Sequence, residues 1–349
     1  MNIEIIPFEP EAATEREWGR FHAYRRVRHE ETDPKDPIAE DTTTEKLMKR
    51  PDPHVKISRF AVVEAAQPSR QIGSLDYYTF REESPSYHAN KHLAYVELEV
   101  LRSSRRRGVG RTILAEAAKL AKEHGKAVIL SSCFEEDGMA FIRAINAQVA
   151  LKGQENRLYL DRVEWQMVER WAEEGPTRSP HSTLQWFTNR IDESIIGDYS
   201  EIYTETANQA PLDDLDVNDI IHTPESFRVQ EARIADVGGT WLTAITREAK
   251  GQISGLTEMI HWPDRETMIQ QGLTGVKEAY RGSGLGKWLK VAMLLRVRRE
   301  FPQVKVITTT NATSNAPMLS INQRLGFKIH RETVMAQIGL EALEAYLGR

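Results

Sequence analysis

The sequence lacks several features that would place the protein in a specialised class. Its 349 residues include one cysteine, Cys133, which excludes a disulfide within the chain and a cysteine-rich metal site. No stretch approaches the roughly 18 consecutive apolar residues of a membrane-spanning helix, and residues 1–17 lack the basic and apolar segments of a signal peptide. The ten histidines show no spacing typical of a metal site. We therefore expect a cytoplasmic protein with no bound metal and no membrane partner.

The sequence also lacks an excess of positive charge. Its net charge is −5 and its pI is near 6.1, which gives no support to a nucleic-acid partner. Five arginines do cluster between Arg102 and Arg111, but such a run is more often a solvated face, and we expect no nucleic acid. The length is too great for one ordinary domain and suits two, each able to bury a normal core.

One pattern occurs twice in the chain. Residues 98–110 read LEVLRSSRRRGVG, and residues 274–286 read TGVKEAYRGSGLG. In both stretches a valine is followed five residues later by an arginine, and glycines follow the arginine at the third and fifth positions. The matching residues are Val100, Arg105, Gly108 and Gly110 in the first half and Val276, Arg281, Gly284 and Gly286 in the second. The repetition predicts a duplicated domain.

The order of predicted elements supports the duplication. Each half opens with a helix and continues with a hairpin in which Gly73 corresponds to Gly255. A strand then ends at the arginine–glycine loop, and amphipathic helices follow over residues 111–125 and 287–302. A buried strand, a further helix and a last strand complete each half. The polar, proline-containing segment 165–182 suggests a linker, which predicts domains at residues 1–165 and 180–349.

The repeated loop is suited to an anion. Between a strand and a helix N-terminus, glycines let the backbone approach a ligand closely, while the helix dipole and free N–H groups favour phosphate. A Walker loop would need glycine at Arg281 and serine or threonine at Trp288. A dinucleotide fingerprint would need glycine or alanine at Leu289 and Ile113. Both nucleotide motifs are therefore excluded.

The remaining pattern, V-x-x-x-x-[QR]-x-x-G-x-G, resembles the coenzyme A pyrophosphate loop of the GNAT family of acyl-CoA-dependent N-acetyltransferases. The segment TTTNATSNAPMLSINQRLGF, which ends at Phe327, is similar to the family's next strand and helix. The resemblance covers both halves. It implies an α/β (α+β) protein with two GNAT-like domains, each a mixed, mostly antiparallel sheet flanked by helices. It also implies acetyl-CoA as the acyl donor, and no metal.

The resemblance implies a set of donor-binding residues in each half. Backbone groups before the loop would hold the pantetheine arm between two splayed strands, and loop amides would hold the pyrophosphate. In the second half these residues are Thr274, Gly275, Val276, Arg281, Gly282, Ser283, Gly284, Leu285, Gly286 and Lys287, with Asn311 and Asn315 as further polar contacts or as helix and turn caps. In the first half they are Leu98, Val100, Arg105, Arg106, Arg107, Gly108, Val109 and Gly110.

Candidate catalytic residues lie in the second half. Glu258, on a strand beside the acceptor side, is either a base that draws a proton through water or an exposed surface charge, and Asp76 is its counterpart. Glu97 and Glu99 share a strand face and suggest mostly solvated charges. The family often has a tyrosine acid where this chain has Asn322. Because the first half has Asn146 and Ala147 where the second has Gly326 and Phe327, we expect catalysis in the second half and a more degenerate first half.

These observations predict an N-acetyltransferase. The resemblance implies that a deprotonated primary amine of a small molecule attacks the thioester of acetyl-CoA directly, so that the enzyme contributes positioning, oxyanion stabilisation and proton removal. Two alternatives stay open. One is a non-catalytic acyl-CoA-binding or regulatory protein, and the other is an acetyltransferase that acts on a protein N-terminus or lysine.

Overall fold

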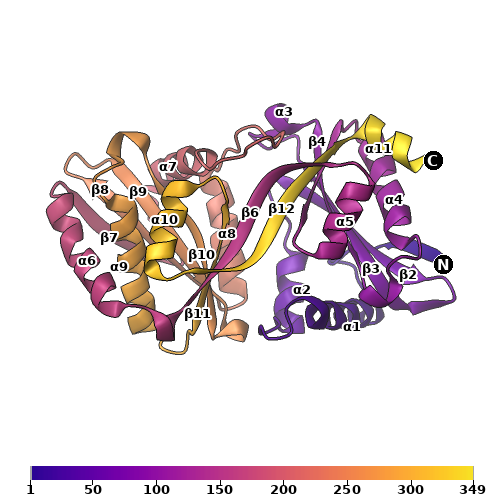
Figure 1. Cartoon of the computed structure of the whole chain (residues 1–349), viewed down its shortest axis with the longest axis horizontal. Helices are drawn as coiled ribbons and strands as arrows, with labels where there is room; N and C mark the ends of the chain where they lie inside the picture. The colour runs from indigo at the N-terminus through magenta and orange to yellow at the C-terminus, as the bar shows by residue number, and fades with distance from the viewer. Residues whose placement is uncertain (1, 349) are drawn as a thin grey trace. The chain divides into compact units, whose positions relative to one another are not determined.

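The computed structural model describes residues 2–348, which form two compact units. Unit 1 comprises Met1–Leu151, Asp213–Asn218 and Thr333–Arg349, and unit 2 comprises Lys152–Leu212 and Asp219–Glu332. The first and last strands of the described chain therefore both contribute to unit 1 (Figure 1). The units do not follow the two halves of the sequence, because the last helix of the chain and the last strand from Thr333 onward are part of the first unit.

Unit 1 is built on a mixed sheet in the order β1-β2-β3-β4-β5-β12. Its strands are β1 (Ile3–Pro7), β2 (Val55–Glu64), β3 (Gln67–Phe80), β4 (Leu93–Val100), β5 (Val128–Cys133) and β12 (Lys328–Gly339), of which Val334–Gly339 pair with β5. Its helices are α1 (Glu15–Thr32), α2 (Asp41–Lys49), α3 (Tyr87–Asn90), α4 (Val109–Glu123), α5 (Glu136–Ala144) and α11 (Leu340–Leu347), with a 3-10 turn η1 (Arg102–Ser104) before the loop.

Unit 2 repeats this plan in the order β6-β11-β10-β9-β8-β7. Its strands are β6 (Gln148–Tyr159), β7 (Ser182–Thr188), β8 (Thr240–Glu248), β9 (Ile253–His261), β10 (Met268–Val276) and β11 (Val306–Ala312). Its helices are α6 (Trp165–Arg178), α7 (Ile196–Asn208), α8 (Pro224–Asp236), α9 (Leu285–Glu300) and α10 (Ala316–Leu325), with 3-10 turns η2 (Leu160–Arg162), η3 (Pro263–Arg265) and η4 (Glu278–Tyr280).

The sheets are mostly antiparallel, as the sequence predicts. The pairs β4–β5 and β10–β11 are parallel, and the other pairings within the units are antiparallel. The hairpins β2–β3 and β8–β9 occupy the positions expected from the duplication. Gly73 pairs with Val100 and Gly255 pairs with Val276, so the two halves also share the register that leads into the loop. The predicted fold class is confirmed.

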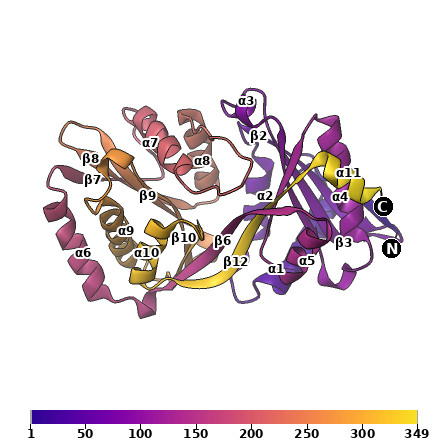
Figure 2. The same cartoon turned by 45° about the horizontal axis from the view of Figure 1, so that its top comes forward.

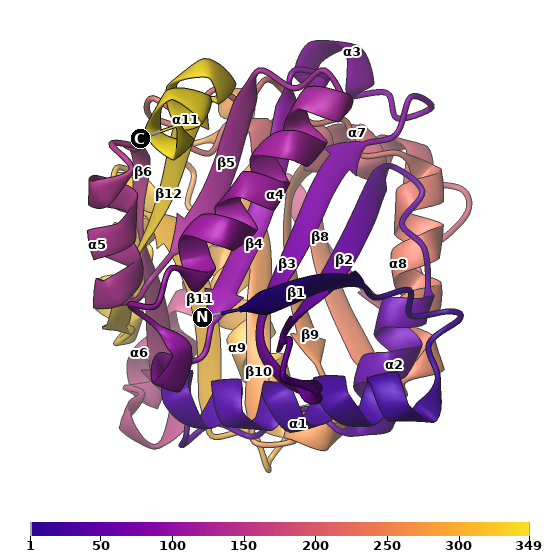
Figure 3. The same cartoon turned by 90° about the vertical axis from the view of Figure 1, so that its right-hand side faces the viewer.

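Helices cover both faces of each sheet. Successive side chains of a strand point to opposite faces, so each face needs its own covering layer. In unit 1, α4 buries Ile113, Leu114 and Ala117 against the sheet (Figure 3). In unit 2, α9 and α6 lie on one face and α7 on the other (Figure 2). The predicted helix ends are confirmed, since Gly125 follows α4 in a left-handed conformation and α9 ends just before Pro302. No helix within residues 2–348 is long and apolar enough to cross a membrane.

The segment that the sequence suggests as a linker is helical. Residues 165–178 form α6, which carries buried Val168 and Trp171 on one side and packs along α9. Gly175 permits this close approach, because a Cβ there would lie 2.3 Å from the ring of Trp288. Tertiary packing of an apolar helix face has overridden the polar composition and the proline of this segment.

Candidate functional site

The two arginine–glycine loops adopt one backbone geometry. Arg105 Nε donates to the Val100 carbonyl at 2.9 Å, and Arg281 Nε donates to the Val276 carbonyl at 3.2 Å. The helices α4 and α9 begin directly after Gly108 and Gly284, whose φ angles are 83° and 92°. Only glycine adopts this left-handed conformation without penalty, which explains why both loops place glycine there.

The two loops differ in the residue that occupies a second left-handed position. In unit 2 it holds Gly282, with φ of 84°, and in unit 1 it holds Arg106, with φ of 60°. A residue with a side chain pays about 1–2 kcal/mol for this conformation. The first loop therefore retains the shape of the second while adding a third guanidinium next to Arg105 and Arg107.

The loop amides are available to a ligand. Within residues 2–348, no acceptor faces the backbone N–H groups of residues 106–111 or of residues 282–287. Neither helix has a side-chain cap at its N-terminus. Unpaired amides at the start of a helix make a strong anion site, and the open space around Gly108 leaves room for the ligand. These observations fit the pyrophosphate of an acyl-CoA.

The central strands diverge next to each loop. The β4–β5 pairing runs from Leu93 to Tyr95 and then stops, although β4 continues to Val100. The β10–β11 pairing stops at Gln270, although β10 continues to Val276. Each unit therefore has the splayed strand pair that the family resemblance implies, with one edge of β4 and of β10 open beside the loop.

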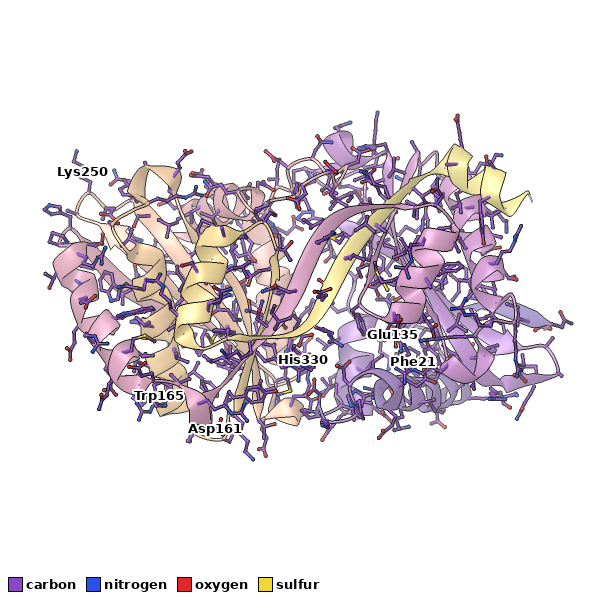
Figure 4. All side chains as sticks on the ribbon, viewed as in Figure 1. Phe21, Glu135, Asp161, Trp165, Lys250 and His330 are labelled. Carbon is purple, nitrogen blue, oxygen red and sulfur yellow. The ribbon has the colours of Figure 1, made fainter. Side chains whose placement is uncertain are left out.

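In unit 1 this divergence opens into a cavity of about 430 Å³. One wall is formed by residues 97–100 of β4 and by the loop. The other is formed by the end of β5, by residues 134 and 135 after it and by the start of α5, and Glu135 is labelled in Figure 4. Arg105, Arg106, Gly108 and Gly110 all line the cavity. Leu98 and Val100 line it as well, whereas Arg107 is exposed outside it and Val109 is buried in the core of unit 1.

The arginines of this cleft are paired with carboxylates. Arg105 donates to Glu135 at 2.7 Å and to Asp137 at 3.0 Å, and Arg106 donates to Asp137 at 3.2 Å. Arg28 of α1 also donates to both oxygens of Glu135. Burial alone raises the pKa of Glu135, but the bonds and charges of Arg28 and Arg105 outweigh it and lower that pKa. A phosphate that binds here must compete with these carboxylates for the guanidiniums.

In unit 2 the loop is supported by α6. Ser179 donates to the Ser283 carbonyl at 3.2 Å, and Lys287 contacts Glu174 at 3.3 Å. Arg178 lies near Gly284, where a Cβ would be 3.2 Å from its Nε. Sequence reasoning missed Arg178, because the segment around it suggested a linker.

The remaining predicted donor-side residues of unit 2 have identifiable partners. Thr274 Oγ1 lies 2.8 Å from the hydroxyl of Thr257, and Gly275 faces Thr206 of α7, which leaves no room for a side chain. Asn315 accepts from the Met318 amide and thus caps α10. Asn311 accepts from the amide of buried Asn322 at 2.9 Å. A role for Asn311, Asn315 or Asn322 toward a ligand stays a prediction.

Glu258 is a buried residue and not the exposed charge that one interpretation of the sequence suggested. It is 6% exposed and accepts from Tyr203 at 2.9 Å, from Trp241 at 3.0 Å and from the Leu273 amide at 3.3 Å. Burial raises its pKa, against the effect of these donors. Its carboxylate therefore braces the irregular part of β10 near Gly272, where the β9–β10 register shifts.

A different set of carboxylates meets the cleft of unit 1. Asp76 on β3 lies directly opposite Glu97 on β4, and Glu97 and Glu99 line the cavity. Burial raises the pKa of Asp76 to about 6, against the nearby Arg59 and with the help of Glu97 and Glu99. The sequence suggested mostly solvated charges at Glu97 and Glu99. Glu97 is exposed, as that interpretation implies, but both residues line the cavity of unit 1. The alternation of acidic residues on two adjacent strands was the available signal.

The closing turn of the first half keeps its shape despite the different sequence. Gly326, with φ of 97°, ends α10, and Asn146, with φ of 55°, follows α5. Asparagine tolerates this conformation better than other residues with side chains. The absence of Gly-Phe in the first half therefore does not remove the turn itself.

Comparisons with known proteins agree with this architecture. The model of the acetyltransferase (GNAT) family matches residues 21–143, and no curated protein matches the sequence. The structure resembles a tandem GNAT protein from the clavulanic acid biosynthesis pathway, with 21% identity, a TM-score of 0.76 and coverage of 97% of this chain and 99% of that one. It also resembles a GCN5-related N-acetyltransferase from Sphaerobacter thermophilus, with 12% identity, a TM-score of 0.65 and coverage of 97% and 96%. The GNAT family model thus matches residues 21–143, and the fold of nearly the whole chain resembles that of a tandem GNAT protein and of a GCN5-related N-acetyltransferase.

Proposed function

We propose that the protein transfers an acetyl group from acetyl-CoA to a primary amine of a small molecule. The observation that carries this proposal is the cleft of unit 1, where a run of unpaired loop amides meets the open edge of β4. A pyrophosphate would bind to the amides of residues 106–111 and to Arg105 and Arg106. The pantetheine arm would pair with the open edge at Leu98 and Val100.

The chemistry requires positioning and proton removal. The donor supplies an activated thioester, and the free amine attacks its carbonyl, so that the N–C bond forms while the C–S bond breaks. The amine must first lose a proton. A carboxylate whose pKa is near 6, such as Asp76, accepts a proton readily at neutral pH through its neighbours or a water molecule. The cleft therefore offers a donor site, and a candidate base lies next to it on β3, opposite Glu97.

The two units compete for the catalytic role. The sequence favours unit 2, with Glu258 as base and Asn322 near the leaving thiolate. The geometry favours unit 1, because Glu258 is enclosed by three donors while Glu97 and Glu99 line an open cleft beside Asp76. The family model also matches the first half. We therefore propose that turnover takes place in unit 1 and that the loop of unit 2 is a second acyl-CoA site.

Paired loop variants test this proposal. Gly108→Asp introduces a negative charge where phosphate would bind, whereas Gly108→Asn has nearly the same shape without the charge and tolerates a left-handed conformation. Gly284→Asp and Gly284→Asn form the matching pair in unit 2. We expect calorimetry to show a loss of acetyl-CoA affinity of about 100-fold at one site for each Asp variant relative to its Asn control, since two or three charge-assisted bonds become repulsive.

Turnover assays separate the units. At an acetyl-CoA concentration near the KM of the unsubstituted protein, Gly108→Asp is expected to remove most of the thiol release, and Gly284→Asp is expected to leave most of it. The reverse pattern would assign catalysis to unit 2, as the sequence suggests, and Glu258→Gln would then show a rate loss that recovers at high pH. Tight acetyl-CoA binding with no turnover of any amine or peptide acceptor would support a binding protein instead.

A further inference from the structure

One face of the β3–β4 strand pair, beside the cleft of unit 1, gathers the carboxylates of Asp76, Glu97 and Glu99, and is called the acidic face below. Asp76 and Ser74 point from β3 to the same side as Glu97 and Glu99 from β4, because Asp76 pairs with Glu97 and Ser74 pairs with Glu99 in the strand register. Like charges directly opposite each other destabilise a sheet. A local conflict of this kind is typical of a functional site, where stability is sacrificed for binding.

Of the carboxylates of Asp76, Glu97 and Glu99, two already form an ion pair with an arginine. Asp76 lies 3.3 Å from Nε of Arg59, and Glu99 lies 3.2 Å from Nε of Arg28 while it also accepts from Tyr24 at 3.0 Å. Glu97 accepts only from the hydroxyl of Tyr78, at 2.9 Å, and has no ion-pair partner among residues 2–348. One uncompensated negative charge therefore remains on this face.

The uncompensated charge opens onto the cleft. Glu97, Glu99 and Ser132 line the cavity from its two walls, and Tyr95 bridges the walls through a 2.7 Å bond to Ser132. The rings of Tyr78 and Tyr95 meet edge to face with centroids 5.5 Å apart. An ammonium group would find at Glu97 a carboxylate with free acceptor positions and aromatic walls beside it.

We propose that the acceptor is a cationic amine without a carboxylate beside its amino group, and that Glu97 is the residue that recognises its charge. The inference rests on the proposed function of the same cleft. An α-amino acid would bring its own carboxylate next to Asp76, Glu97 and Glu99. The guanidiniums of Arg28 and Arg59 cannot readily accommodate it, since each is already paired with a carboxylate of this face. Alkyl amines, diamines and aryl-ethylamines meet the requirement, and amino acids do not.

Matched pairs of substrates test the inference directly. The full-length protein is assayed for thiol release from acetyl-CoA with cadaverine against lysine, putrescine against ornithine, and tyramine against tyrosine. Members of a pair differ by one carboxylate. We expect kcat/KM to be at least about tenfold higher for the amine in the best-used pair, because a like charge a few ångströms away is strongly repelled at a partly buried site.

A substitution at Glu97 identifies the residue responsible. Glu97→Gln keeps the shape and should raise KM for the amine about tenfold or more and reduce the preference over the matched amino acid. Glu83→Gln, on the exposed turn after β3, removes one charge elsewhere in unit 1 and should change neither value. Circular dichroism and calorimetric acetyl-CoA affinity confirm that both variants fold and bind the donor.

The outcomes separate the inference from the function on which it rests. Turnover that is equal or better with the amino acids would overturn the inference and leave the acetyltransferase assignment intact. A loss of kcat in Glu97→Gln with unchanged KM and unchanged preference would also overturn it, because recognition would then lie elsewhere. Acetyl-CoA binding without turnover of any of the six compounds or of a wider amine panel would overturn the proposed function itself.

Discussion

Nη2 of Arg105 lies 2.7 Å from Oε2 of Glu135, so the arginine–glycine loop of unit 1 is held by a carboxylate. Glu135 also accepts two hydrogen bonds from Arg28, and Arg28 contacts Glu99 on the acidic face. A continuous chain of ion pairs therefore connects the proposed donor site to the proposed acceptor site. Removal of one member of this chain should affect both ends.

Glu135→Gln is expected to strengthen acetyl-CoA binding. The carboxylate competes with phosphate for Arg105, and its loss leaves that guanidinium available to the ligand. We expect a dissociation constant several-fold lower by calorimetry, equivalent to about 1 kcal/mol. We also expect a loss of about 1–2 kcal/mol in the free energy of unfolding, because Arg28 and Glu135 are largely buried. Weaker binding would instead show that Glu135 orients Arg105 toward the phosphate.

Asp76 should set the acidic limb of the pH–rate profile. Because burial raises the pKa of Asp76 to about 6, kcat/KM should rise as the pH increases through about 6 and the carboxyl loses its proton. Asp76→Asn is expected to lower the rate at pH 8 and to abolish this limb or move it to lower pH. An unchanged profile in this variant would exclude Asp76 as the proton acceptor.

Lys290 should destabilise unit 2 at neutral pH. It is 3% exposed, its Nζ lies 3.7 Å from Met318 Sδ and 5.5 Å from the Phe327 ring centre, and burial lowers its pKa to about 7. Between about pH 7 and the unfolded pKa of about 10.4 the unfolded state binds more protons, so stability rises with pH across this window and the penalty is fully present below it.

Lys290→Met should remove this penalty. The thermal midpoint at pH 6.5 should rise by several degrees, at about 2–4 °C per kcal/mol for a domain of this size. The gain should shrink toward pH 10, where the native lysine is neutral. Lys250→Met, on an exposed turn, is the control and should show no such pH dependence. A gain of equal size at both pH values would show that the substitution acts through packing alone.

Gly175 should be essential for the packing of α6 on α9. An alanine Cβ would lie 2.3 Å from the ring of Trp288, so that the indole or the helix must shift. We expect Gly175→Ala to cost about 1–3 kcal/mol in urea unfolding. Gly197→Ala, in a helix of the same unit where no atom lies within 4 Å of the new Cβ, should be neutral or slightly stabilising. A neutral Gly175→Ala would contradict the close approach of the two helices.

Local features of the sequence were enough to predict the repeated loop and the elements around it. The left-handed positions at Gly108 and Gly284 favour glycine, and the apolar spacing in α4 and α9 favours a helix, so these residues largely specify their own conformation. The proposed anion site follows from the same local rule, because free amides at a helix start do not depend on distant partners.

Contacts between distant residues decided the rest. Residues 165–178 became helix α6 because Val168 and Trp171 found an apolar surface on α9. The C-terminal strand joined unit 1 through pairing with β5, a choice that no local pattern encodes. Glu258 and Glu97 are both acidic residues on strands, yet one is enclosed by three donors and the other faces an open cleft. Burial and charge pairing depend on the surroundings in three dimensions. Only the tertiary structure therefore distinguishes Glu258, which holds β10 in place, from Glu97, which is a candidate binding group.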